Sequence, residues 1–253
     1  MQKYSFHFNF KIGMQNHFLI TLQVLVCAVL KLWKQKDNFL HKHHTPARQF
    51  YLITGFFSIK RNNYQNTMIL PRTEALILLR KYIKNEKMIA HSLASEVVMI
   101  ALANHLGRNS EAWAQAGLLH DIDVEVTNAD PYIHGTEAAK WLAGMGVDAD
   151  IVDAIGMHNE IATGKARVNE FQHALAAGET ITGLIMATAL VYPDKKIASV
   201  KTKSVVKRMK EKAFAASVKR ENIMECELIG IPIDEFAAIA ISAMSGIAED
   251  IGL

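Results

Sequence analysis

The helical spacing of apolar residues from Met68 onward is the feature that most restricts the fold of this chain. Leu76, Leu79 and Ile83 recur three or four positions apart, which places them on one face of a helix. No alternation of apolar and polar residues longer than four positions follows, so the sequence offers no clear β-strand. We therefore predict an all-α fold for this region.

Turn and cap residues divide the region into separate helices. Gly107 and Pro193 mark the ends of the two longest helices, while Ser110 and Asp234 are expected to cap the starts of two others. His105 is expected on the apolar face of its helix. The predicted helices cover residues 71–82, 87–106, 110–121, 136–142, 148–155, 168–191, 203–218, 220–228 and 234–249.

A sharp change in charge separates the first 67 residues from the rest. Residues 1–67 hold nine Lys and Arg against one acidic residue, whereas residues 68–253 are net acidic by five charges. Twelve of the 20 aromatic residues also lie in the first segment. We predict a boundary at Met68, with an N-terminal extension of doubtful structure over 1–67 and one domain over 68–253.

The N-terminal extension has one apolar stretch, Phe18–Trp33. Its uncharged run, Phe18–Leu30, has 13 residues, whereas a membrane-spanning helix needs about 20. Three interpretations remain open: a weak membrane-surface anchor, a disordered or partner-binding extension, and non-native sequence upstream of a translation start at Met68. We favour the third and expect no membrane partner.

The two cysteines, Cys27 and Cys226, fall in different segments. They do not suggest a disulfide framework, so we expect a reducing, cytoplasmic setting. Any metal ligands must then come from histidines and carboxylates.

Several polar groups stand in apolar helical surroundings. His91 lies on the apolar side of its helix, His120-Asp121 follows Gly-Leu-Leu at a helix end, and Glu179 lies within a long apolar helix. A single buried histidine is usually a hydrogen-bonded structural residue, and Glu179 could face solvent. Taken together with His134 and His158, these groups favour a metal site with nitrogen and oxygen ligands.

The pattern H…HD…(D/E) resembles the signature of the HD superfamily of metal-dependent phosphohydrolases. The stretches KNEKMIAHSLASEVVM, WAQAGLLHDIDVEVTNADPYIHG, IVDAIGMHNE, AAGETITGLIMATALV and KSVVKRMKEKAFAA resemble, in that order, small bacterial HD proteins. The resemblance extends from Ile69 to Gly246. It implies an HD-type helical bundle and a metal-dependent hydrolase.

The resemblance also implies a ligand set. His91 matches the first ligand, His120 and Asp121 match the HD pair, and Glu179 stands where the family has its last aspartate. Glutamate is one methylene longer, so either the metal geometry adjusts or a water molecule intervenes.

A second metal is implied by two further positions. His134 and His158 match residues that bind a second ion in dinuclear members, where the aspartate of the HD pair bridges both. Asn159 replaces a histidine found in some of these members, and the Gly-Tyr-Pro element of the cyclic-dinucleotide phosphodiesterases is absent. We expect one or two divalent ions, from among Mn, Fe, Mg, Zn and Co.

Hydrolysis then follows from metal chemistry. A bound divalent ion lowers the pKa of water from about 15.7 toward neutrality and polarises a phosphoryl oxygen. Asp121 is expected to be catalytic as well as a ligand. Asp123 or Glu125 could hold the water or transfer protons, although both could be solvated turn carboxylates. His158, if it does not bind metal, could protonate the leaving oxygen.

A basic run over residues 201–220 holds eight Lys and Arg against one acidic residue. Lys203, Lys207 and Lys210 are spaced for one helix face and are the expected substrate-binding residues. The ordinary alternative is a solvated helix face. Nucleic acid is not an expected partner, because residues 68–253 are net acidic.

The leading hypothesis is hydrolysis of a phosphate ester, in a nucleotide or another small phosphorylated metabolite. Two alternatives remain open: oxygen chemistry at a di-iron site, and a non-catalytic ligand-binding or regulatory module.

Overall fold

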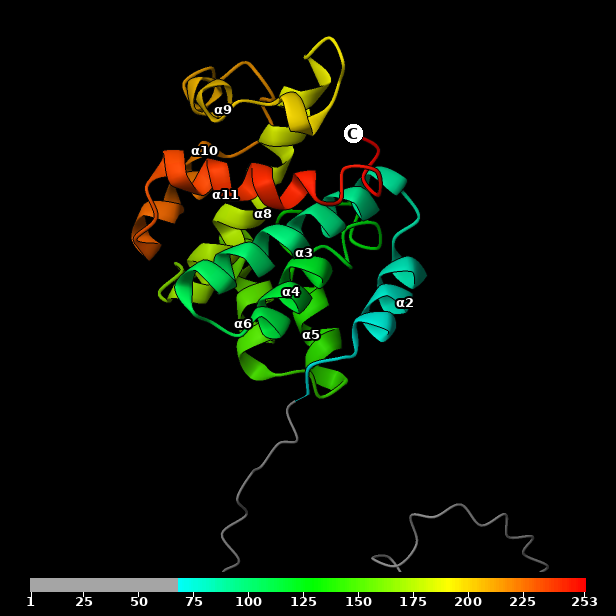
Figure 1. Ribbon diagram of the computed structural model, residues 1–253. Coiled ribbons are helices and arrows are strands. Elements are labelled where there is room, and N and C mark those ends of the chain that lie inside the picture. Colours follow the sequence, from blue (N-terminus) through cyan, green and yellow to red (C-terminus); the bar gives the residue numbers. More distant parts are fainter. Residues whose placement is uncertain (1–67) are drawn as a thin grey trace, which may run out of the picture. The chain divides into compact units, whose positions relative to one another are not determined.

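The computed structural model describes residues 68–253, which are coloured in Figure 1. These residues form an all-helical body without strands, as predicted, apart from one isolated bridge between Met68 and Val147. Predictions for residues 1–67, including the apolar stretch 18–33, lie outside the described part. The elements are α2 (Arg72–Tyr82), α3 (Glu86–Leu106), α4 (Ser110–Leu119), α5 (Thr136–Gly144), α6 (Ala149–Met157), α7 (Glu160–Thr163), α8 (Glu170–Leu190), η2 (Ile197–Ser199), α9 (Thr202–Met209), α10 (Arg220–Met224), η3 (Glu225–Ile229) and α11 (Ile233–Ser245).

The two longest helices, α3 and α8, form the centre of the body. Helix α3 packs against α4, α8 and α11, and α11 runs alongside it in Figure 1. Both α3 and α8 are long and apolar enough to cross a membrane by length and composition alone, but 50% and 67% of their apolar windows are buried inside this body. Their apolar character therefore fits core packing. His105, predicted on the apolar face, is instead exposed near the end of α3.

Asparagine side chains begin most of the helices that carry the site. Asn85 accepts a hydrogen bond from a backbone N–H in the first turn of α3, and Asn169 begins α8 with a capping box to Gln172. Asn109, not Ser110, caps α4, because its side chain reaches two backbone N–H groups of the first turn. Helix α11 likewise begins after Pro232, so that Asp234 lies in its first turn.

Helix α9 ends at Met209, nine residues before the predicted end at 218. The guanidinium of Arg220 donates hydrogen bonds to several backbone carbonyls of the following turns, those of Ala215 and Val218 at 2.7 Å each among them. Ala215 also has a left-handed φ of 46°, which a continuous helix does not allow. Arg220 therefore satisfies carbonyls that a longer helix would have paired internally.

Helices α3 and α4 approach each other closely at Gly117. A Cβ atom at this position would lie 2.6 Å from the backbone oxygen of Ser95, so no larger residue fits without a shift of the backbone. This contact fixes the end of α4 against α3, and His120 follows three residues after Gly117. The close packing thereby positions the HD pair opposite His91.

Candidate metal centre

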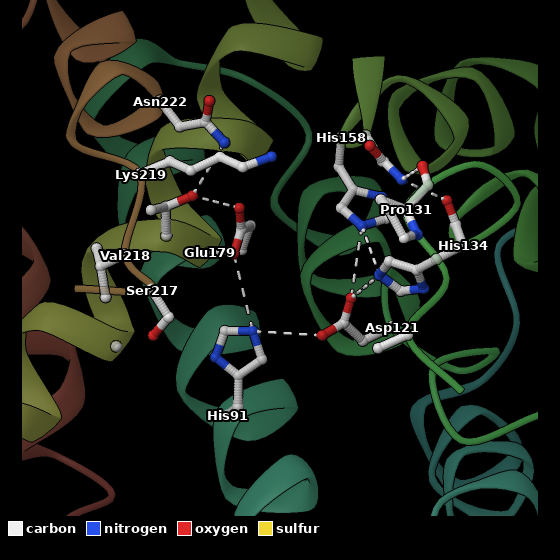
Figure 2. Close-up of a pocket in the computed structure, with 14 residues that line it drawn as sticks. His91, Asp121, Pro131, His134, His158, Glu179, Ser217, Val218, Lys219 and Asn222 are labelled. Atoms are coloured by element: carbon white, nitrogen blue, oxygen red, sulfur yellow. Dashed lines mark hydrogen bonds and ion pairs between the residues drawn. The ribbon is translucent and has the colours of Figure 1, made fainter. Parts of the chain in front are cut away.

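Six side chains from five segments of the chain meet at one cluster. His91 comes from α3, the pair His120-Asp121 follows α4, and Glu179 comes from α8. His134 lies in the turn before α5, and His158 ends α6. In Figure 2, His91 and Glu179 lie on one side of Asp121, and His134 and His158 lie on the other.

The first half of the cluster consists of His91, His120 and Glu179. The Nε2 atoms of His91 and His120 are 3.1 Å apart, and Nε2 of His91 lies 3.8 Å from Oε2 of Glu179. The three potential ligand atoms lie within 4.8 Å of one another, which is close enough to surround one ion. Oδ2 of Asp121 faces this half, at 3.6 Å from Nε2 of His91.

The second half consists of Asp121, His134 and His158. Oδ1 of Asp121 lies 3.0 Å from Nε2 of His134 and 3.4 Å from Nε2 of His158, while the two histidine nitrogens are 3.2 Å apart. These atoms form a second group that could hold an ion. Oδ1 of Asp121 also lies 3.3 Å from Nε2 of His120 in the first half. The Asp121 carboxylate therefore contacts both halves and has the position of a bridge between two ions.

Hydrogen bonds orient each histidine ring through its Nδ1 atom. Nδ1 of His120 donates to the carbonyl of Gly117 at 2.9 Å, and Nδ1 of His158 donates to that of Ile155 at 2.6 Å. A carbonyl oxygen only accepts hydrogen bonds, so both rings carry a proton on Nδ1. Their Nε2 atoms are then free to bind metal, which is the usual arrangement of a ligating histidine.

His91 is oriented by Thr182. The Thr182 hydroxyl donates to the backbone oxygen of Glu179 at 2.6 Å and so accepts from Nδ1 of His91 at 2.9 Å. Thr182 was not among the residues predicted from the sequence. A hydroxyl three residues after a carboxylate ligand in an apolar helix is the signal that could have found it.

His134 is oriented by Asp123. The Asp123 carboxylate accepts from Nδ1 of His134 at 2.7 Å and from the backbone N–H groups of Gly135 and Ala138 at 2.7 and 3.0 Å. Gly135 has a φ of 87°, and a Cβ atom on it would lie 2.6 Å from Cε1 of His158. Only glycine therefore fits at this position.

The donor set and its geometry fit divalent metal ions. In neutral rings protonated on Nδ1, the facing Nε2 atoms of each histidine pair would bring two lone pairs together. A positive charge, either a proton or a metal ion, is therefore required between them. Imidazole nitrogens and carboxylate oxygens are ligands that suit divalent transition metals. The hydrogen bonds behind the rings hold them in this orientation.

Burial and neighbouring charges set the protonation of the metal-free cluster. Burial lowers the pKa of His120 to about 3, so this ring is neutral. Burial also acts to lower the pKa of His134, but hydrogen bonds to Asp121 and Asp123 outweigh it and raise the pKa to about 10. Burial acts to raise the pKa of Asp121, yet the hydrogen bond from the protonated His134 ring holds it well below its ordinary value. Burial raises the pKa of Glu179.

A cavity of about 290 Å³ opens onto the cluster. Five of the six cluster side chains line it, and His120 lies behind them, fully buried. Thr180 and Gly183 of α8 continue the wall. The residues that complete the lining are Ala129, Pro131, Asn159, Ser217, Val218, Lys219 and Asn222.

The structure does not bring Asp123 or Glu125 to this cavity. Asp123 is fully buried behind His134, with both carboxylate oxygens taken by hydrogen bonds. Glu125 accepts from the backbone N–H groups of Lys84 and Asn85, at 2.9 and 2.8 Å, before the start of α3. Asp123 is thus placed as a positioning residue, and Glu125 as a support for the start of α3.

The expected substrate-binding lysines also lie elsewhere. Lys203, Lys207 and Lys210 are exposed on and just after α9, and none lines the cavity. Lys219, from the end of the same basic run, does line it. The helical spacing favoured the first three lysines, but the chain leaves the helix at Met209, so spacing no longer decides which lysine reaches the site.

Arg167 is another residue that sequence reasoning missed. Its guanidinium is buried and donates to the backbone oxygen of His158 at 3.1 Å, to the side chain of Asn222 at 3.1 Å and to Glu225. Arg167 therefore connects His158 of the cluster to the segment with Asn222 and Glu225, and Asn222 lines the cavity.

Comparison with protein families gives one match. The model of the HD domain matches residues 88–190, a range that runs from the start of α3 to the end of α8 and contains all six side chains of the cluster. Neither a curated protein nor a solved structure matches the chain.

Proposed function

Residues 88–190 of this chain form an HD domain, and on that basis we propose that the protein hydrolyses a phosphate ester of a small phosphorylated molecule in a metal-dependent reaction. The HD domain implies the superfamily of metal-dependent phosphohydrolases. The observation that carries the proposal is the presence of two ligand groups on the wall of a cavity, with the Asp121 carboxylate of one group also in contact with His91 and His120 of the other.

The residues that would hold metal follow from the two groups. His91, His120 and Glu179 would hold one ion, His134 and His158 a second, and Asp121 would contribute to both. When bound, a divalent ion supplies a nucleophilic hydroxide near neutral pH and stabilises negative charge on a phosphoryl oxygen.

The protein's own groups orient and attract the substrate. Lys219 provides a positive charge on the cavity wall that would draw a phosphate toward the cluster. The amide of Asn222 also lines the cavity and donates to the hydroxyl of Thr180 at 3.4 Å, so it stands where it could donate to a phosphate oxygen instead. His158 has only Nε2 available, because Ile155 occupies Nδ1. It therefore cannot bind metal and donate a proton to a leaving group at the same time.

The cavity favours a small substrate. Its volume is about 290 Å³, and no Phe, Tyr or Trp lines it among residues 68–253. A nucleobase would find no Phe, Tyr or Trp ring to stack on among the described residues that line it. The base of a nucleotide substrate would have to lie outside, so we favour a small phosphorylated metabolite.

The experiment is a metal-reconstitution assay on the full chain. Protein stripped with a chelator should not hydrolyse p-nitrophenyl phosphate or a panel of sugar phosphates and nucleotides, and addition of Mn²⁺ should start the reaction. Asp121→Ala should be inactive, and Lys207→Ala, at an exposed position, should retain full activity. Absence of turnover for every compound with the metal-loaded protein would reject the proposal and favour a ligand-binding or regulatory role.

A dinuclear iron site for oxygen chemistry is the second candidate. The observation that favours it is the position of the Asp121 carboxylate between two ligand groups, since a bridging carboxylate suits a pair of iron ions. Oxygen consumption by iron-loaded protein, without hydrolysis of any phosphate ester, would favour this candidate.

A further inference from the structure

Asn222 of α10 has an amide whose orientation is fixed at both ends. Its Oδ1 atom accepts from Nη2 of Arg167 at 3.1 Å, and its Nδ2 atom donates to the hydroxyl of Thr180 at 3.4 Å. A guanidinium has only donors, so the atom that faces Arg167 must be the oxygen. The NH₂ group is therefore the end turned toward Thr180, which lines the cavity at the metal cluster, as Asn222 does (Figure 2).

The hydroxyl of Thr180 continues the same chain of hydrogen bonds. It donates to Oε1 of Glu179, a side chain of the metal cluster. A hydroxyl has one proton, so the bond between Thr180 and Asn222 must be donated by the amide, which agrees with the orientation set by Arg167. The amide has two protons and bonds one acceptor among residues 68–253. A substrate oxygen can therefore bind it beside Thr180 or in its place.

The guanidinium of Arg167 is itself held in place by several acceptors. It is buried and donates to the carboxylate of Glu225, at 2.6 Å for the shortest bond. It also donates to the backbone oxygens of Met157 and His158, at 3.0 and 3.1 Å. Arg167 does not line the cavity, and Glu225 compensates its charge. Any effect of Arg167 on a substrate would therefore pass through Asn222.

We propose that Asn222 donates an N–H to a phosphoryl oxygen of the substrate, and that Arg167 is the positioning residue that keeps this N–H, rather than the amide oxygen, turned toward the cavity. The proposal rests on the proposed function, because it takes the substrate to be a phosphate ester. An unrestrained asparagine could turn its oxygen toward the phosphate and would then repel it. The bond from Arg167 removes that alternative and preorganises the wall for a group that accepts hydrogen bonds.

Binding of inorganic phosphate to the Mn²⁺-loaded full chain, measured by isothermal titration calorimetry, tests the proposal. Asn222→Ala removes the donor and should weaken binding about tenfold, as expected for a hydrogen bond to a charged group. Arg167→Lys keeps a positive charge beside Glu225 but lacks the planar fork, so it should weaken binding about fivefold. In the Asn222→Ala background, Arg167→Lys should change the affinity by less than about twofold, because the residue on which it acts is gone.

The double variant separates positioning from general support of the fold. An equal effect of Arg167→Lys in both backgrounds, or unchanged phosphate binding in Asn222→Ala, would overturn the proposal. Arg108→Lys alters an arginine that pairs with Glu170 outside the cavity, and this matched control should bind phosphate like the unmodified protein. Elemental analysis should give the same metal content for all variants, so that a loss of affinity is not a loss of metal.

Asn222→Asp decides the matter if Arg167→Lys fails to fold. Aspartate still accepts from Arg167 but sets a carboxylate oxygen where the amide has its NH₂ group, so phosphate should bind more weakly than to Asn222→Ala. Binding as tight as in the unmodified protein would overturn the proposal, as would an unmodified protein that does not bind phosphate. Phosphate binding with the expected losses, but without turnover of any phosphate ester, would reject the proposed function and retain the roles of Asn222 and Arg167.

Discussion

His91 and His120 face each other through their Nε2 atoms at 3.1 Å, while the Nδ1 atom of each ring is held by a hydrogen bond from behind. This arrangement explains why two imidazoles can stand so close in the interior. Their orientation is fixed by Thr182 and by the carbonyl of Gly117, both of which belong to the helical scaffold. The cluster is thus preorganised for an ion rather than formed by it.

Metal stoichiometry tests the two-group arrangement. The full chain should bind two divalent ions, Glu179→Ala should retain one, and Asp121→Ala should lose both because its carboxylate faces both groups. Elemental analysis after dialysis measures this directly. Circular dichroism should show unchanged helix content for both variants. A full metal complement in Asp121→Ala would contradict the bridge.

The role of Asp123 can be separated from catalysis by Asp123→Asn. The amide would set its NH₂ group against donors that now bond the carboxylate, so His134 would lose its fixed orientation. We expect affinity for one of the two ions to fall about 10- to 100-fold, as for other groups that orient ligands. Saturating metal should then restore much of the activity.

A direct proton-transfer role for Asp123 predicts the opposite result. Activity would fall about 10²- to 10⁴-fold with metal content unchanged, and added metal would not rescue it. Glu125→Gln is the matched control, because the Glu125 carboxylate accepts from the backbone N–H groups of Lys84 and Asn85, outside the cavity.

The sequence was sufficient to predict the all-α class and the residues that form the cluster. His91, the HD pair and Glu179 are polar groups inside apolar helices, and such groups need a common partner. Their apolar surroundings are a local property of the sequence and favoured a metal site, and the resemblance to the HD superfamily then implied which residues form the ligand set. The same reasoning could not assign Asp123, because its partners Gly135 and Ala138 come from the next helix start.

Non-local contacts also account for the errors around α9. The helix ends at Met209 because Arg220, eleven residues later, bonds the carbonyls of the following turns. No local sequence pattern predicts the hydrogen bonds between Arg220 and these carbonyls. The chain that follows the helix brings Lys219 to the cavity wall, whereas Lys207 stays on the exposed side of α9.

Lys219→Ala tests the attraction of the phosphate. The variant should raise KM for a phosphate monoester about tenfold with a smaller effect on kcat, since a charge on the wall acts mainly on binding. Its KM should also depend less on salt concentration than that of the unmodified protein. Lys207→Ala, with its side chain 79% exposed, should match the unmodified protein in both respects. Equal effects of the two substitutions would argue against a local role for Lys219.

Cys226 should be an unreactive thiol in the folded protein. It is fully buried, and burial, together with the nearby charge of Glu227, raises its pKa to about 12. In the variant Cys27→Ser, where Cys226 is the remaining cysteine, Ellman's reagent at pH 8 should label less than about a tenth of the thiol until denaturant is added. Rapid labelling of the native variant would show that the thiol is accessible.

The raised pKa of Cys226 also predicts a dependence of stability on pH. The folded state holds the thiol proton more tightly than the unfolded state, whose pKa is about 9. The contribution of this group to stability is therefore present below about pH 9 and is lost as the pH rises through about 12. Urea unfolding across this range should show a smaller decline for Cys226→Ala than for the unmodified protein. Lysines and tyrosines titrate alike in both proteins, so the difference isolates the thiol.

A fragment that begins at Met68 should fold and bind metal like the full chain. The backbone of Met68 donates to the oxygen of Gly146 at 3.1 Å and accepts from the N–H of Asp148 at 3.1 Å, and Leu70 then bonds Gln115. The described residues are therefore tied into the body from their first position, and their core is continuous from α2 to α11. Circular dichroism, thermal unfolding and elemental analysis of residues 68–253 should match those of the full chain. An insoluble or unfolded fragment would mean that part of the stability comes from residues 1–67, and that the boundary predicted at Met68 is wrong.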